Sequence, residues 1–105
     1  MGYVYLIKDT LNNIYKIGVT KDLNKRLRNL QTGNSNHLAL LSYYQTEYPF
    51  RLETMLHDKF KEYHILNEWY ELPERITNNF NAECKSLDNI IISLKDNPFF
   101  NKKLK

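Results

Sequence analysis

Two short runs of β-branched and aromatic residues near the start of the chain constrain its fold more than any other feature. Residues 3–8 read YVYLIK and residues 14–20 read IYKIGVT, and both runs have the composition of strands. The five residues between them, 9–13, are rich in turn formers. This pattern predicts an antiparallel β-hairpin, so the chain begins with a sheet rather than a helix.

The rest of the chain alternates helical and strand patterns. Thr20 or Asp22 can cap a short helix over 21–33, and Gly33 can end it. A third strand is predicted over 38–46, a helix from Pro49 through 50–63, an extended segment over 68–72, and helices from Pro73 to Leu94 with a break near Asn79. We therefore predict an α+β fold, with a small antiparallel sheet of about three strands flanked by helices.

Length and composition favour a single globular domain. The chain has 105 residues, of which 42% are hydrophobic and 26% charged, enough apolar residues for one core. We expect one domain over 1–95, with a core over 2–72, a C-terminal helical part over 73–95 and a short tail over 96–105. Cys84 is the only cysteine, which excludes an internal disulfide and a cysteine-based zinc cluster.

Charge and hydropathy limit the partners of the chain. No apolar run approaches the roughly 20 residues that cross a bilayer, so we expect a soluble, intracellular protein without a membrane partner, in the cytoplasm or a host nucleus. The net charge of +3 permits binding to nucleic acid but does not require it.

Helical spacing separates the two arginines of the first predicted helix. At about 100° per residue, Leu23, Leu27 and Leu30 form one apolar stripe. Arg26 flanks this stripe, whereas Arg28 points into solvent. Arg26 is therefore the arginine that we expect to lie against the sheet.

The second long helix places two ionisable residues beside its apolar stripe. Glu53 lies about 20° from Phe60 around the helix, and His57 follows one turn later on the same side. Both side chains are expected to be partly desolvated. Partial burial of an ionisable group costs free energy, so their position needs an explanation.

Alternation along the hairpin places further polar groups together. Tyr5 shares a face of the first strand with Tyr3 and Ile7, and Lys16 shares a face of the second with Gly18. If these faces coincide, an ammonium lies close to a phenol. Gly18, without a side chain, could let a substrate or the following helix approach.

These landmarks resemble the GIY-YIG nuclease family over roughly residues 2–72. The GIY element corresponds to Tyr3-Val4-Tyr5 and the YIG element to Lys16-Ile17-Gly18, so that a lysine replaces the second tyrosine. Arg26 and Glu53 fall where the family carries its arginine and its metal-binding glutamate. The segments YKIGVT, LHDKF and EWYEL are most similar to a small branch found in phages, large DNA viruses and some fungal proteins.

The resemblance implies a metal-dependent endonuclease that hydrolyses phosphodiester bonds in DNA. Glu53 would hold one Mg²⁺ or Mn²⁺ ion that keeps most of its waters. Tyr5 would act as general base with help from Lys16, and Arg26 would bind the phosphate. His57 could touch phosphate or water.

Each assignment has a plainer alternative. Tyr5 could be only a core residue, Glu53 and Arg26 could form a salt bridge, and His57 could be a helix histidine with its hydrogen bonds satisfied. The whole chain could instead be a non-catalytic nucleic-acid-binding module, or an interaction domain that uses the apolar stripe of its last helix.

The expected partner is DNA, double-stranded or branched. Lys21, Lys25 and Arg28 could steer it, although such charges often form only a solvated helix face. Specific readout buries about 1,000 Å² or more, which is a large share of so small a domain. We therefore expect weak sequence preference, cutting directed by DNA structure, or specificity that comes from a second copy of the chain or from another protein.

Overall fold

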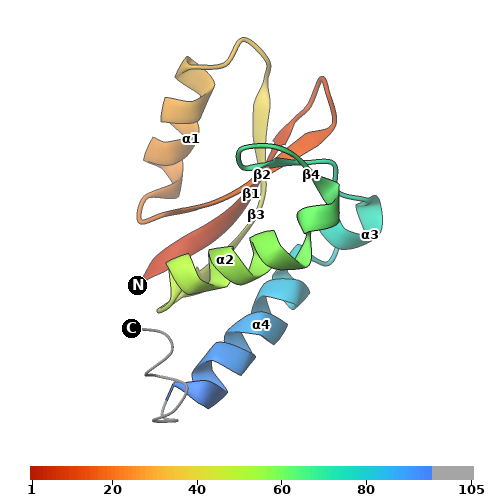
Figure 1. Cartoon of the computed structure of the whole chain (residues 1–105). Helices are drawn as coiled ribbons and strands as arrows, with labels where there is room; N and C mark the ends of the chain where they lie inside the picture. The colour runs from red at the N-terminus through yellow and green to blue at the C-terminus, as the bar shows by residue number, and fades with distance from the viewer. Residues whose placement is uncertain (96–105) are drawn as a thin grey trace.

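The computed structural model describes residues 1–95, which form an α+β domain with an antiparallel sheet, as the sequence predicts (Figure 1). The predicted tail over 96–105 lies outside the described residues. The strands are β1 (Gly2–Asp9), β2 (Ile14–Thr20), β3 (Leu38–Thr46), β4 (His64–Leu66) and β5 (Trp69–Tyr70). The helices are α1 (Leu23–Thr32), α2 (Pro49–Lys59), α3 (Glu74–Thr77) and α4 (Phe80–Leu94).

The sheet has the order β3-β1-β2-β5-β4 and is wider than the three strands expected. The predicted hairpin and third strand are present: β1 pairs with β2 on one side and, on the other, with β3, which lies at one edge of the sheet. The two additional strands are very short, and the chain reverses between them at Asn67, which has a positive φ of 54°. β5 pairs with β2 only at Tyr15 and Lys16, so it covers only the beginning of that edge of β2.

The turn of the hairpin is organised by Asp9, a buried carboxylate. It accepts hydrogen bonds from the backbone N–H groups of Leu11 and Asn12 and from the side-chain amides of Asn12 and Asn36. These bonds lower the pKa of the Asp9 carboxyl, the one to Asn36 most. Asp9 thereby ties the hairpin to the loop before β3.

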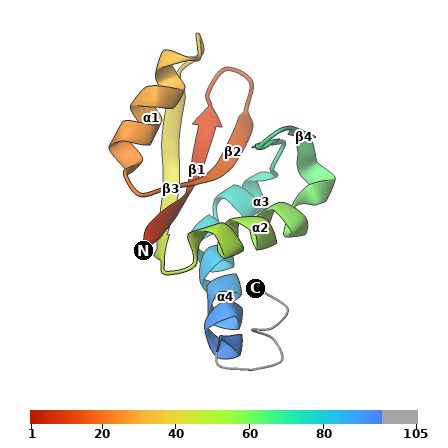
Figure 2. The ribbon, with the colours of Figure 1, turned by 60° about the vertical axis from the view of Figure 1, so that its left-hand side comes forward.

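Helices cover the two faces of the sheet unequally (Figures 1 and 2). α1 lies on one face, over a small apolar cluster of Tyr5, Ile7 and Leu38. α2, α3 and α4 cover the other face with a much larger cluster, whose most deeply buried members are Val4, Leu6, Ile17, Leu52, Leu56, Phe80, Cys84 and Ile91. Most of the apolar core thus lies between the sheet and α2 to α4.

The helix boundaries follow local signals with one exception. Asp22 caps α1 by accepting from the backbone N–H of Lys25, and Gly33 follows its last residue, as predicted. α2 begins at Pro49 as predicted but ends at Lys59, and the predicted extension to Tyr63 is wrong. There a 3₁₀ turn over Lys61–Tyr63 redirects the chain into β4.

α4 packs mainly on its own domain. Leu87 and Ile91 are buried in the larger cluster, and the buried Asp88 carboxylate accepts hydrogen bonds from Thr46 Oγ1 at 2.8 Å and the Tyr44 hydroxyl at 3.1 Å. Ile90 is 45% exposed, so only part of the predicted apolar stripe is covered.

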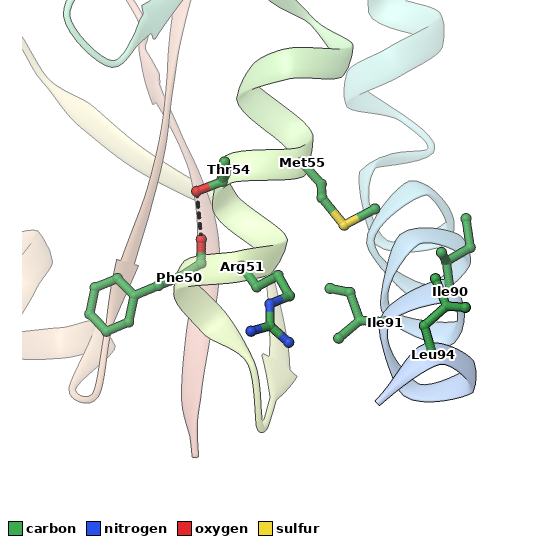
Figure 3. A pocket seen from close by; sticks show the side chains of 7 residues that line it. All are labelled: Phe50, Arg51, Thr54, Met55, Ile90, Ile91 and Leu94. Atoms are coloured by element: carbon green, nitrogen blue, oxygen red, sulfur yellow. Dashed lines mark hydrogen bonds between the residues drawn. The ribbon is translucent and has the colours of Figure 1, made fainter. Parts of the chain in front are cut away.

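An apolar groove of about 540 Å³ runs between α2 and α4 (Figure 3). Met55 and the side chains of Ile90, Ile91 and Leu94 line it, whereas Phe50 points away from them. No helix in residues 1–95 is both long and apolar enough to cross a membrane.

Candidate active site

Tyr5 and Gly18 form the base of the candidate site, on the face of the sheet that α1 covers. The two residues are directly paired across β1 and β2, and the Tyr5 side chain lies over the Gly18 backbone. A Cβ atom at position 18 would lie only 2.3 Å from the Tyr5 hydroxyl oxygen and 2.5 Å from Cζ. The space that Gly18 leaves is therefore filled by Tyr5 of the same protein, and not by the following helix.

Arg26 reaches the Tyr5 hydroxyl from α1. Its Nε–H donates a hydrogen bond of 3.2 Å to the phenol oxygen, while Arg28 lies exposed on the other side of the helix. The sequence prediction that Arg26 faces the sheet is thus confirmed. No ion pair joins Arg26 to Glu53 within residues 1–95, so the salt-bridge alternative does not hold.

Lys16 lies on the same face but has a different partner from the one expected. Its ammonium forms an ion pair of 3.2 Å with Glu68 Oε2 and lies 5.5 Å from the centre of the Trp69 ring. Only 12% of the Lys16 side chain is exposed, compared with 39% of Glu68. Arg26 is therefore the residue that hydrogen-bonds to the Tyr5 hydroxyl, whereas Lys16 is held by Glu68 and Trp69.

Glu53 and His57 approach from α2 and are both half-buried, as predicted. The His57 Nε2 lies 3.0 Å from the carbonyl oxygen of Ile17, which can only accept, so this ring nitrogen donates. The ring also packs against Tyr70, with centroids 5.4 Å apart. His57 therefore fixes α2 to β2 next to Gly18, which is the structural role left open as its alternative.

The electrostatics of these groups differ from those of exposed side chains. Burial raises the pKa of the Tyr5 phenol above its ordinary value, and the hydrogen bond and charge of Arg26 oppose this rise. Burial likewise raises the pKa of the Glu53 carboxyl, with His57 opposing. The charge of Glu68 adds to both rises, so Glu68 belongs to the same electrostatic environment.

Glu68 is the residue of this site that sequence reasoning missed. It lies within the predicted extended segment over 68–72, whose sequence is EWYEL, and has no predicted role of its own there. Its backbone carbonyl accepts from Ile17 N–H at 3.3 Å, which fixes the segment beside β2. The available signal was an acidic residue directly before a short strand, but which strand that segment joins depends on tertiary structure.

The candidate site is suited to one hard cation that is bound by few protein atoms. Within residues 1–95 there is no group of three or more His, Cys, Asp or Glu side chains placed to hold a metal. Glu53 offers a single half-buried carboxylate. Mg²⁺ typically takes one or two protein carboxylates and keeps several waters, so Glu53 fits that ion better than one that needs an all-protein cage.

The three basic residues assigned to nucleic-acid steering, Lys21, Lys25 and Arg28, are all exposed. Lys21 precedes α1 and the other two lie on its outward side, so the three extend along the helix that carries Arg26. They lie on the α1 side of the sheet, the side on which the Tyr5 hydroxyl is found.

Comparison with known proteins identifies the family of the chain. The T5orf172 domain matches residues 2–87, most of the chain. The chain belongs to this family of nuclease-related domains. It is also similar to the uncharacterized protein 460R of Invertebrate iridescent virus 6, with 36% identity over 76 residues.

The viral protein is larger than the region that matches this chain. The viral match covers 68% of this chain but 34% of the viral protein, so the chain spans about a third of its length. No solved structure matches the chain.

Proposed function

We propose that this T5orf172 domain is a metal-dependent endonuclease of the GIY-YIG type that hydrolyses phosphodiester bonds in DNA. The observation that carries the proposal is the contact of Tyr5 with Arg26 over Gly18. Three separate elements supply these residues, and the close approach leaves no room for a side chain at position 18. A buried phenol needs a hydrogen-bond partner in any role, but here the partner is a cation rather than a neutral group.

Arg26 binds the phosphate in this proposal. Its Nε–H is engaged by Tyr5, which leaves the two terminal NH₂ groups of the guanidinium to form a fork on phosphate oxygens. The hydrogen bond fixes the orientation of the fork before substrate arrives. Such a pre-organised cation stabilises charge that develops on the phosphate.

Tyr5 accepts the proton of the attacking water. An ordinary phenol has a pKa near 10. Because burial raises the pKa of Tyr5 further, the phenol is protonated near neutral pH and needs nearby positive charge to act. Arg26 supplies such charge, and Lys16 would add to it on the same face if substrate drew its ammonium away from Glu68.

Glu53 is the proposed ligand of one Mg²⁺ or Mn²⁺ ion. When bound, such an ion polarises the phosphate and stabilises the leaving oxygen. His57 acts by holding α2, and with it Glu53 one turn earlier, against Ile17. Lys21, Lys25 and Arg28 attract the DNA backbone along α1.

The direct test is conversion of supercoiled plasmid to open circles with and without Mg²⁺ or Mn²⁺. Glu53→Gln keeps the size of the side chain but removes its charge, and it should abolish metal-dependent nicking while DNA binding persists. Glu62→Gln, the same change at an exposed position, is the matched control and should cut normally. Equal nicking by the Glu53 and Glu62 variants would remove the metal assignment.

A second candidate is a non-catalytic DNA-binding module on the same fold. The observation favouring it is the Lys16–Glu68 ion pair, which engages the lysine that replaces the second tyrosine of the family. Salt-sensitive DNA binding without nicking under any metal would support this candidate. Lys16→Tyr should then restore cutting if the lysine alone is responsible.

A further inference from the structure

A hollow of about 440 Å³ lies next to the candidate site, on the same side of the sheet. Tyr3 and Tyr43 contribute aromatic rings to it, Leu23 and Leu40 contribute apolar surface, and Lys21, Asp22 and Asn24 contribute polar groups. No role proposed above uses it. Its lining combines flat aromatic groups with a cation, which is the chemistry that binds unpaired nucleotides.

An irregularity in β3 brings two of these side chains together. Leu40 and Tyr43 are three residues apart, so in a regular strand they would point to opposite faces. The β1–β3 register shifts between Leu6 and Ile7, which pair with Ser42 and Leu40 and leave Leu41 as the extra residue. This bulge turns Tyr43 to the α1 side, and bulges commonly re-aim side chains beside functional sites.

Tyr43 has the exposure and orientation of a stacking platform. It lies in β3, at one edge of the sheet, and is 53% exposed although it is a large aromatic residue. Its ring lies nearly perpendicular to that of Tyr3, with centroids 5.9 Å apart and planes at 76°. The edge-to-face contact fixes the Tyr43 ring while much of its surface faces solvent.

The charges at the hollow suit an anion beside the ring. Lys21 is exposed at its edge, and Lys25 lies one turn into α1. The carboxylate of Asp22, the acidic residue of the lining, already accepts a hydrogen bond from the backbone N–H of Lys25. A nucleotide would thus meet an aromatic ring for its base and an ammonium for its phosphate.

The hollow also lies at the correct distance from Tyr5. Tyr43 pairs directly with Tyr5 across β1 and β3, and Tyr3 lies two residues before Tyr5 on the same face of β1, roughly 7 Å along the strand. Stacked nucleotides of one strand advance by about 3.4 Å each, so the hollow extends about two nucleotides from Tyr5 along the strand.

We propose that the Tyr3–Tyr43 hollow binds an unpaired base next to the phosphodiester bond that is cut. The proposal rests on the proposed nuclease function and specifies its substrate as DNA with an unpaired nucleotide, such as a flap or a bulge. A perfect duplex keeps its bases stacked on each other and does not fill the hollow.

Binding is measured in the full chain carrying Glu53→Gln, which is expected to bind without cutting. The probes are fluorescein-labelled oligonucleotides: a duplex with a three-nucleotide flap and the same duplex without it. Tyr43→Leu should weaken binding to the flap duplex roughly tenfold, the scale of one base–aromatic stack, and leave the plain duplex unchanged. Tyr43→Phe keeps the ring and should bind like the parent.

Tyr63→Leu, the same change on the α2 side of the sheet, is the matched control and should leave flap binding unchanged. Equal loss for both duplexes, or no loss with Tyr43→Leu, would overturn the base subsite and leave the nuclease proposal intact. Conversely, if Glu53→Gln still nicked plasmid with metal, the nuclease assignment of Glu53 would fail, whatever the flap preference.

Discussion

The two faces of the sheet differ in how much apolar surface they bury. The face under α2 to α4 is packed with apolar residues such as Leu6, Leu52 and Phe80, each at most 1% exposed. The face under α1 has a much smaller cluster, in which Tyr5 brings a hydroxyl and none of the helix residues is fully buried. Most of the apolar packing thus lies on one face of the sheet, and the contact between Tyr5 and Arg26 lies on the other.

The two faces should respond differently to mutation, and the largest effect is expected on the apolar face. Phe80→Ala removes a ring that is 1% exposed and should lower the free energy of unfolding by about 3–5 kcal/mol in urea denaturation. Leu27→Ala, at a half-buried position of α1, should cost clearly less. If Leu27→Ala lowered the free energy of unfolding more than Phe80→Ala, α1 rather than α4 would contribute more to the stability of the fold.

On the polar face, Gly18→Ala should separate activity from folding. The new Cβ would lie 2.3 Å from the Tyr5 hydroxyl oxygen, so the phenol must leave Arg26. We expect plasmid nicking to fall on the order of 100-fold, the lower range for losing a general base. Gly33→Ala meets nothing closer than 3.9 Å and should cut normally. Normal cutting by the Gly18 variant would show that Tyr5 is not needed in this position.

The pH dependence of cutting tests the electrostatics of the candidate site, to which β1 contributes Tyr5 and α2 contributes Glu53. Because the pKa of Tyr5 is raised, its base form is scarce at neutral pH, and the rate should rise about tenfold per pH unit on the alkaline side. Because the pKa of Glu53 is also raised, the carboxylate is protonated at a higher pH than in an ordinary glutamate, and cutting should fail earlier on acidification. A rate independent of pH on the alkaline side would argue against a phenol base.

The smallest expected change comes from Glu68→Gln. Since the charge of Glu68 adds to the raised pKa of both Tyr5 and Glu53, its removal should move both limbs of the pH profile of nicking to lower pH. The melting temperature should hardly change, because the lost ion pair with Lys16 is partly exposed. A large loss of stability with an unmoved profile would assign Glu68 a structural role instead.

Local sequence signals predicted much of this fold. The hairpin, the strand over 38–46, the cap at Asp22 and the helix break near Asn79 depend on neighbouring residues, and all are present. Helical periodicity also placed Arg26 toward the sheet and Glu53 and His57 at half-buried positions. The strand β4 was missed because three exposed residues carry no alternating pattern.

What the sequence determined by itself is most of the elements and the face on which each polar residue of the site lies, because both follow from spacing along one segment. Only the tertiary structure decided the partners: Arg26 rather than Lys16 at the Tyr5 hydroxyl, Glu68 at Lys16, and the Tyr5 ring over Gly18. These contacts join segments far apart in the chain. Strand register and helix packing set them, and no local pattern encodes those.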